Sequence, residues 1–163
     1  LPKRDKLELI IQKAVELGAS SIVPVMMARS NVRLDDKKAD RKAERLAEIA
    51  KSAAEQSKRG ILPEVASPKR FADAIALAKD ADIKLICYED ETAAGRLQAL
   101  LPQLDSAKKI ALLVGPEGGI SEEEWQAATC AGFQSVSLGR RILRTETAGL
   151  CLLSFLMLHL ENA

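Results

Sequence analysis

The period of the hydrophobic and polar positions changes repeatedly along this chain, and that alternation predicts its elements. An apolar stripe at helical spacing opens the sequence: Leu7, Ile10, Ile11, Ala14 and Val15. Gly18 follows as a glycine that ends the helix. A longer amphipathic helix is expected at 37–57, where apolar residues occupy one face and charges the other. Residues 21–26 between them predict a short strand, and Pro24 favours an edge position or an early end.

The rest of the chain continues to alternate between helical and strand-like segments. Ser67 and Pro68 predict an N-cap and a first-turn proline before a helix at 69–79. Ser121 and Glu124 form a capping-box pattern. The other expected elements are strands at 83–88, 109–115 and 133–138 and helices at 92–101, 121–131 and 147–160. The run 109–115 is continuously apolar, which is typical of a strand buried on both faces. We therefore expect one α/β domain over residues 1–163, a mostly parallel sheet flanked by helices.

Composition and charge narrow the class of protein only slightly. The 163 residues are 47% apolar and 3% aromatic, with a net charge of +1, so no global basic signal for nucleic acid exists. The distribution is uneven: residues 1–70 carry 16 Lys and Arg against 10 Asp and Glu, and residues 71–163 carry 8 against 13. This asymmetry suits either a basic face toward RNA or simply solvated helix surfaces.

The cysteine and histidine content argues against disulfide and zinc chemistry. Cys87, Cys130 and Cys151 are odd in number and widely spaced, which favours a reducing, cytoplasmic location. His159 is the only histidine, so a zinc site is not expected, and its leucine neighbours favour a helix-end or core role. The longest apolar run, 148–160, is too short to span a bilayer.

Two glycine-bearing loops, each following a predicted strand, are the most informative feature of the chain. The first reads GPEGG at 115–119, and the second, at 138–144, combines Gly139 with three arginines. A third strand end carries Cys87, Tyr88 and Glu89. Neither loop matches GxGxxG or a P-loop, and each alone is compatible with a tight turn or a solvated surface. Because parallel sheets bind ligands at the carboxyl ends of their strands, the pair indicates a small-molecule site with a nucleic acid beside it.

The two segments LLVGPEGGISEEE and SLGRRILRTETA resemble the C-terminal half of the RsmE-type 16S ribosomal RNA uridine N3-methyltransferases, members of the SPOUT superfamily. The resemblance covers nearly the whole chain. Upstream it rests on these positions: Lys6, Glu8, 11–18, Pro24, Arg29, Ser30, 54–59 and Pro63. Members of the family carry an N-terminal RNA-binding β-barrel of the PUA type, to which nothing here corresponds. With Leu1 in place of Met, we expect the catalytic domain alone.

The resemblance implies a SPOUT-type fold with a C-terminal trefoil knot, in which the loops 115–119 and 138–145 form the knot and the helix 148–160 is threaded. It implies S-adenosyl-L-methionine as the cofactor, a homodimer, no metal and no membrane. Glu89 is expected to accept from the ribose hydroxyls. The other expected cofactor contacts are Val114, Gly115, Gly118, Gly119, Leu138, Gly139, Ile142, Leu143 and Thr145.

The implied reaction is methyl transfer to N3 of a uridine in 16S ribosomal RNA of the small subunit. Because N3 carries a proton, the enzyme needs a base or a cation that stabilises the developing anion. Arg144 is expected to stabilise charge, and Glu146 or Glu117 to act as base. Alternatively, Glu146 only favours the N-terminus of the last helix, and Arg144 binds a phosphate. The expected RNA contacts are Arg29, Arg33, Gln56, Arg59, Arg140 and Arg141.

Two other functions fit the same residues. A SPOUT enzyme that methylates the ribose 2′-oxygen or another base would keep the same cofactor loops. A non-catalytic RNA-binding module is the alternative of a different class. The near-neutral charge and the scarcity of aromatic residues disfavour it. Proteins that bind single-stranded RNA by stacking usually carry more aromatic side chains and more positive charge.

Overall fold

The computed structural model of the protein describes residues 4–30, 36–88 and 95–162. The helices are α1 (Arg4–Glu16), α2 (Asp36–Gln56), α3 (Phe71–Leu77), the 3-10 helix η1 (Leu97–Leu100), α4 (Leu101–Leu104), α5 (Glu122–Cys130) and α6 (Thr145–Glu161). The strands are β1 (Ser21–Ile22), β2 (Val25–Met26), β3 (Glu64–Val65), β4 (Lys69–Arg70), β5 (Ile83–Cys87), β6 (Gly95–Arg96), β7 (Ile110–Val114) and β8 (Gln134–Ser137).

The main sheet has the strand order β6-β8-β5-β7, and every pairing in it is parallel. Leu85 of β5 lies opposite Leu112 of β7 on one side and Gln134 of β8 on the other. Two short parallel pairs, β1-β3 and β2-β4, join the N-terminal helices to this sheet. The expectation of a mostly parallel sheet flanked by helices is confirmed.

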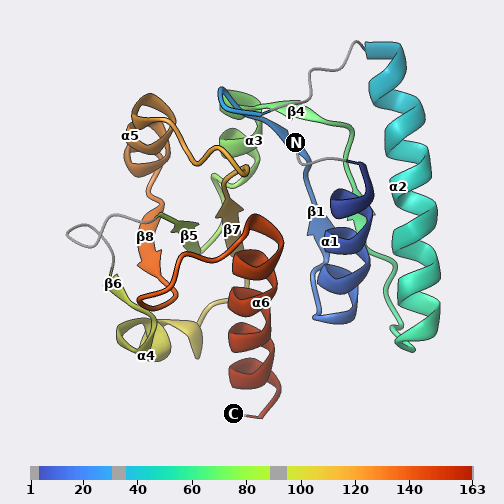
Figure 1. The fold of residues 1–163 in the computed structure, drawn as a ribbon. Helices are drawn as coiled ribbons and strands as arrows, with labels where there is room; N and C mark the ends of the chain where they lie inside the picture. The colour runs from blue at the N-terminus through green and yellow to red at the C-terminus, as the bar shows by residue number, and fades with distance from the viewer. Residues whose placement is uncertain (1–3, 31–35, 89–94, 163) are drawn as a thin grey trace.

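Helices cover both faces of the main sheet because successive side chains of a strand point to opposite sides. Leu85 packs in a core with Leu104 of α4 and Leu152 of α6, whereas the next residue, Ile86, packs with Ala128 of α5 on the other face. All five of these apolar side chains are fully buried. This arrangement places the carboxyl ends of β5, β7 and β8 together at one edge of the sheet (Figure 1).

The two N-terminal helices form a separate apolar core beside the sheet. Ile11 and Val15 of α1 pack against Leu46 and Ala50 of α2, as the helical stripes predict. α1 also packs against α6, so the N-terminal helix reaches the C-terminal part of the fold (Figure 1).

The predicted N-cap at Ser67 and Pro68 is wrong. Lys69 and Arg70 form β4, because the Lys69 N–H donates to the Pro24 carbonyl across the parallel pair with β2. The helix therefore begins only at Phe71 and has no side-chain cap. The tertiary pairing overrides the local signal.

Four other expectations need smaller corrections. The predicted strand 21–26 is interrupted at Val23 and Pro24, giving β1 and β2 with different partners. Within 92–101, residues 92–94 lie outside the described residues, Gly95–Arg96 is strand β6, and helix begins at Leu97. β7 is an edge strand of the described sheet and only Leu113 in it is buried, although Ile110 and Leu112 pack against one core and Ala111 against the other. The last helix starts at Thr145, two residues earlier than expected.

Candidate active site

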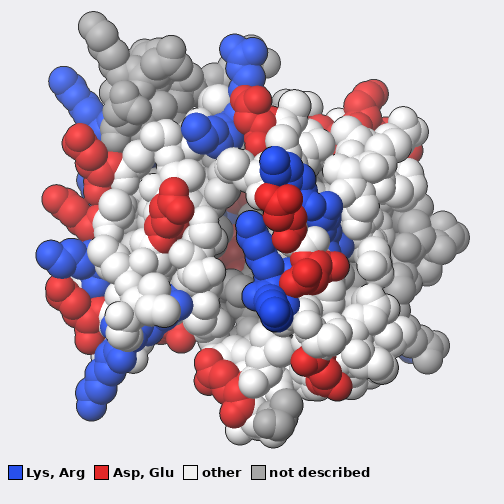
Figure 2. Space-filling model, turned by 180° about the vertical axis from the view of Figure 1, so that it is seen from behind, with Lys and Arg blue, Asp and Glu red and all other residues white. Residues whose placement is uncertain are grey.

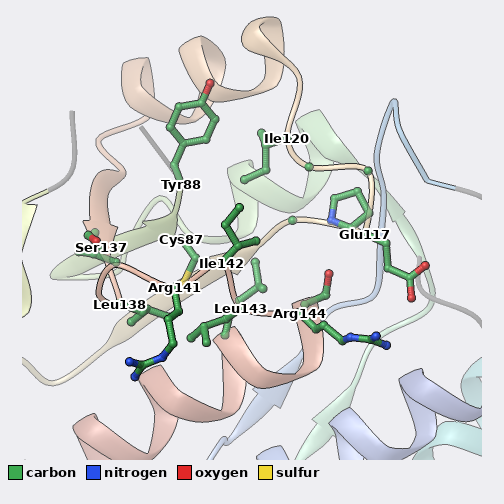
Figure 3. Close-up of a pocket in the computed structure, with 18 of the residues that line it drawn as sticks. Cys87, Tyr88, Glu117, Ile120, Ser137, Leu138, Arg141, Ile142, Leu143 and Arg144 are labelled. Atoms are coloured by element: carbon green, nitrogen blue, oxygen red, sulfur yellow. The ribbon is translucent and has the colours of Figure 1, made fainter. Parts of the chain in front are cut away.

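A cavity of about 1220 Å³ lies where the carboxyl ends of β5, β7 and β8 meet (Figure 3). Loops that follow β7 and β8 form most of its wall, and Cys87 and Tyr88 contribute the end of β5. Nine residues expected to contact a ligand line it: Val114, Gly115, Gly118, Gly119, Leu138, Gly139, Ile142, Leu143 and Thr145. Glu89, the tenth, lies outside the described residues. The fold thus brings segments from three parts of the chain into one site.

The glycines of both loops are required by the backbone conformation and packing of the loops themselves. Gly119 has a φ of +76° and Gly139 a φ of +115°, backbone conformations that side-chain-bearing residues rarely adopt. Gly118 packs against the backbone of Arg29, whose carbonyl oxygen would lie only 3.0 Å from a Cβ at position 118. Close packing therefore fixes the path of the first loop against the segment that follows β2.

A capping box fixes the start of α5 behind this loop, as the sequence predicts. The Glu124 N–H donates to Ser121 Oγ at 3.3 Å, and the Ser121 N–H donates to Glu124 Oε2 at 3.2 Å. The other oxygen, Glu124 Oε1, accepts from the Ala28 N–H at 2.7 Å. Since both Ser121 and Glu124 are buried, one carboxylate holds the glycine loop and the Arg29 segment together.

Three charged side chains meet beside the cavity. Lys6 Nζ, from α1, donates a hydrogen bond to Glu117 Oε1 and lies 3.6 Å from Glu146 Oε1. The bond to Glu117 is the main reason that the pKa of Lys6 lies above its ordinary value; the charges of both carboxylates add to it, while desolvation and Arg144 oppose it. Glu146 Oε2 is buried and has no hydrogen-bond partner among the described residues. Lys6 and Glu117 line the cavity, whereas Glu146 is not one of its lining residues.

Lys6 is one of the cavity-lining residues that sequence reasoning did not select, and it is the charged one among them. Its local pattern is that of an amphipathic helix, and no short motif relates it to Glu117, 111 positions later. Only the packing of α1 against α6 places its ammonium group at the cavity.

The arginines of the second loop point in different directions. Arg144 occupies the N-cap position of α6 with an extended backbone, and its side chain makes no cap hydrogen bond. Among the described residues no hydrogen-bond or ion-pair partner engages its guanidinium group. Figure 3 shows Arg144 on the same side of the cavity as Glu117, whereas Arg141 lies on the opposite side with its guanidinium directed outward. Arg144 is thus an available cation next to two carboxylates.

The expected RNA-contacting residues do not all lie together. Arg29, Arg140 and Arg141 line the cavity, and Gln56 is exposed at the end of α2, away from the cavity wall. The Arg59 guanidinium donates to the carbonyls of Val15, Gly18 and Ala19 at 2.6–3.2 Å, which closes the C-terminal end of α1. Arg33 lies outside the described residues.

The other reactive side chains do not form a nucleophilic centre in the described part of the chain. Burial, with a smaller contribution from Cys151, raises the pKa of the Cys87 thiol to about 12, so the thiol stays protonated at neutral pH. All three cysteines are free. His159 pairs with Asp105 at 2.8 Å near the end of α6 and does not line the cavity.

The surface and the remaining side chains add two findings for the described ranges. Basic and acidic side chains lie close together around a hollow on the face drawn in Figure 2, so that face carries no large patch of one sign. Within residues 4–30, 36–88 and 95–162, no group of three potential metal ligands occurs, and no helix there has the length and apolar character to cross a bilayer.

A parallel sheet covered by helices on both faces, with a cavity at three neighbouring strand ends, defines an α/β domain of the kind in which open sheets bind small ligands at a topological switch point. The model of the RNA methyltransferase domain family matches residues 1–157, and the chain belongs to this family.

Several known proteins are similar over nearly the whole chain. The Ribosomal RNA small subunit methyltransferase E of Bacillus subtilis is 43% identical over 164 residues, covering 99% of this chain and 64% of that protein. A methyltransferase structure from Legionella pneumophila, in complex with the bound cofactor SAM, has a TM-score of 0.89 at 32% identity and covers 97% of this chain and 63% of that one. The structure of the Ribosomal RNA small subunit methyltransferase E from Neisseria gonorrhoeae, bound to S-adenosyl methionine, has a TM-score of 0.83 at 34% identity. The match covers 98% of this chain and 63% of that one. The chain thus spans less than two thirds of the length of these relatives.

Proposed function

We propose that this domain transfers a methyl group from S-adenosyl-L-methionine to N3 of a uridine in the 16S ribosomal RNA of the small subunit. One observation carries the proposal: both glycine loops and the unengaged Arg144 line a single cavity at the strand ends. Support comes from membership of the RNA methyltransferase domain family and from similar structures that were solved with bound S-adenosyl methionine.

The residues of the cavity fit such a cofactor. Backbone groups near Gly115, Gly119, Leu138 and Leu143 are the proposed partners of the adenine. Glycine has no side chain of its own, so a ligand can approach the backbone of such loops closely. Half-buried apolar residues such as Val114 and Leu138 supply an apolar wall. Glu89 is proposed to accept from the ribose hydroxyls, and Gly118, Gly139, Ile142 and Thr145 to complete the site.

The chemistry that the cofactor supplies is an activated methyl group on a sulfonium. The uridine N3 lone pair forms the new N–CH₃ bond, the S–CH₃ bond breaks, and S-adenosylhomocysteine leaves. The N3 proton must go elsewhere. Arg144 is proposed to stabilise the negative charge that develops on the uracil, because a preorganised cation in a cavity acts strongly on developing charge. Glu117, which lines the cavity, and Glu146, which follows the lining residue Thr145, are the proposed proton acceptors.

The proposed RNA path crosses the cavity, so that Arg29, Arg140 and Arg141 of its wall would contact phosphates or bases. Gln56 and Arg33 are proposed as outer contacts. Arg59 is proposed to support RNA binding indirectly, because its guanidinium donates hydrogen bonds to carbonyls at the end of α1. A uridine that reacts at N3 must expose its Watson–Crick edge, so the target is unpaired or flipped out of a helix.

The proposal also covers the knotted fold, the oligomeric state and the cellular location. Residues 1–163 would form one SPOUT domain with a C-terminal trefoil knot, acting as a cytoplasmic homodimer. In α6 only Ala148, Leu152 and Leu156 are buried, whereas Leu158 and Leu160 remain 59% and 45% exposed. An apolar helix with uncovered leucines fits an interface with a second copy.

The first test is calorimetric titration with S-adenosylhomocysteine. We expect saturable binding by the wild type and by Gly60→Val, since Gly60 has open space around it. Gly119→Val is expected to lose binding, because valine at a φ of +76° distorts the cavity loop. Equal affinity of both variants would place the ligand elsewhere, and failure of the wild type to bind would favour a non-catalytic RNA-binding module.

The second test identifies the product. Small ribosomal subunits are incubated with the complete protein and S-adenosylmethionine, and the nucleosides are analysed by mass spectrometry. N3-methyluridine is the expected product. A 2′-O-methylated nucleoside or another methylated base would replace the proposed reaction with the alternative within the same superfamily.

A further inference from the structure

Glu124 is a buried carboxylate whose two oxygens bind different parts of the fold. It belongs to α5 and is only 8% exposed. Its Oε2 accepts from the Ser121 N–H at 3.2 Å, within the capping box. Its Oε1 accepts from the Ala28 N–H at 2.7 Å, across 96 positions of sequence. Because the helix cap uses only Oε2, the bond to Ala28 needs another explanation.

Ala28 belongs to a β-turn that follows β2 and comprises residues 27–30, called here the 27–30 turn. The Ser30 N–H donates to the Met27 carbonyl at 3.0 Å, and the Met27 N–H donates to Ser30 Oγ at 3.1 Å. These two bonds close the turn on itself. The Ala28 N–H donates instead to Glu124, and a bond to a charged acceptor is stronger than one to a neutral acceptor. Glu124 therefore anchors the turn to α5.

Arg29 is the next residue of this turn, and it lies against the glycine loop that follows β7. A Cβ at position 118 would lie 3.0 Å from the Arg29 carbonyl oxygen, and Arg29 Nη1 donates to the Gly118 carbonyl at 3.4 Å. Nη1 also lies 3.7 Å from the place of a Cβ at position 119. The residue is exposed and lines the cavity. The anchored turn thus presents a cation beside the loop.

We propose that Glu124 is a positioning residue for the RNA: by holding the 27–30 turn to α5, it keeps Arg29 oriented at the cavity. The inference rests on the proposed function, in which Arg29 contacts the RNA, and it adds a residue to that function. Glu124 does not line the cavity, so it acts through Arg29. An arginine that is already held in place loses less conformational freedom when the RNA binds, and its contact is therefore tighter.

The packing of the turn explains why loss of this bond should release Arg29 without unfolding the domain. Met27, the first residue of the turn, is 8% exposed and packs in one core with Ile86 and Ile120. This apolar contact does not involve Glu124. Beyond Ala28, the bond between Arg29 and Gly118 is long, at 3.4 Å. Removal of the carboxylate should therefore loosen mainly the part of the turn that carries Arg29.

The experiment is a double-mutant cycle between Glu124 and Arg29. KM for small ribosomal subunits and kcat are measured with the complete protein for the wild type, Glu124→Met, Arg29→Ala and the double variant. Methionine has a similar length but lacks the carboxylate. We expect Glu124→Met to raise KM about threefold to tenfold, within the usual coupling of one hydrogen-bond network, and to change kcat less. Arg29→Ala should raise KM at least as much.

The double variant carries the decisive comparison. In the Arg29→Ala background, Glu124→Met should change KM less than about twofold, because the side chain that it positions is already gone. A carboxylate that only stabilises the fold would have the same effect in both backgrounds.

Ser121→Ala is the matched control. It removes the hydroxyl that accepts from the Glu124 N–H at 3.3 Å and so weakens the same cap, but it leaves the bond between Glu124 and Ala28. Its KM should stay within about twofold of the wild type. The affinity for S-adenosylhomocysteine, measured for every variant, tests whether the cavity is intact.

Ala28→Pro breaks the same bond from the other side, which keeps the inference testable if Glu124→Met does not fold. Proline has no N–H to donate, and it suits the second position of a β-turn. Its KM should rise as that of Glu124→Met does, and its affinity for S-adenosylhomocysteine should be retained.

Each outcome decides the inference. Unchanged KM in Glu124→Met, Ala28→Pro or Arg29→Ala overturns it, and so do effects that simply multiply in the double variant. An equal rise of KM in Ser121→Ala means that only the cap matters. Loss of folding or of cofactor affinity in both Glu124→Met and Ala28→Pro makes the bond purely structural. If the wild type methylates no uridine at all, it is the proposed function that fails, and the two failures are therefore distinguishable.

Discussion

Gly115 and Ile120 are packed so tightly across the loop after β7 that no side chain fits at position 115. A Cβ there would lie 2.6 Å from Ile120 Cγ1 and 3.2 Å from Ile120 Cδ1. Ile120 is itself buried, at 6% exposure, so it has little room to move. The glycine is needed for the packing of the loop whether or not a ligand is bound.

We therefore expect Gly115→Ala to destabilise the fold by about 1–3 kcal/mol, the usual cost of overpacking a well-packed core. Urea unfolding gives the free energy of unfolding directly. Gly60→Ala is the control, because a Cβ at position 60 meets nothing within 4 Å. Gly115→Ala combined with Ile120→Val should recover part of the loss; equal stability of Gly115→Ala and the wild type would contradict the packing argument.

Arg144→Ala is expected to lower kcat about 10²–10³-fold, the typical effect of removing one group that stabilises transition-state charge. Its affinity for S-adenosylhomocysteine should change little, because the guanidinium group is assigned to the uracil. Methyl incorporation into small ribosomal subunits and calorimetry measure the two effects separately.

Arg141→Ala is the comparison for this prediction. Arg141 lies on the opposite side of the cavity and is proposed to contact RNA, so its loss should raise KM more than it lowers kcat. Full activity of Arg144→Ala would remove Arg144 from the mechanism.

Arg59→Met is expected to destabilise the protein by about 1.5–3 kcal/mol, because hydrogen bonds from a charged donor are stronger than neutral ones. Its guanidinium donates hydrogen bonds to three backbone carbonyls at the end of α1. Arg45→Met, which breaks the exposed pair with Glu8, should cost about 1 kcal/mol or less. If thermal or urea unfolding shows the same loss for both, the end of α1 does not depend on Arg59.

Asp82 predicts a pH dependence of stability. Its carboxylate accepts from the Lys109 and Lys108 N–H groups at 2.9 and 2.8 Å, and these bonds hold the pKa of Asp82 below its ordinary value of 3.8. A carboxyl whose folded pKa is lowered stabilises the fold above its unfolded pKa and loses that effect as the pH falls through the folded value.

The urea midpoint of Asp82→Asn should therefore fall below that of the wild type at pH 6, and the difference should shrink as the pH drops below about 4. Asp80→Asn, a nearby exposed carboxylate without a hydrogen bond among the described residues, is the control and should show no such convergence. A difference between Asp82→Asn and wild type that persists at pH 2 would contradict the assigned cause.

Local interactions allowed the sequence to define much of the fold. The stripe through Ile11 and Val15 and the capping box of Ser121 with Glu124 depend on residues three or four positions apart, so they were predictable without tertiary information. The same holds for the glycine loops, because strand, turn and glycine occur in one short segment. These local signals were enough to place the cavity loops at the ends of strands.

The tertiary structure alone decided where distant segments meet. Lys69–Arg70 became a strand through its pairing with Val25–Met26, although the local sequence favoured a helix start. Lys6 meets Glu117 across 111 positions because α1 packs against α6. Arg59, expected to contact RNA, instead donates hydrogen bonds to carbonyls at the end of α1. Side-chain periodicity records only which face of an element is apolar, whereas a contact between elements depends on the packing of the whole chain.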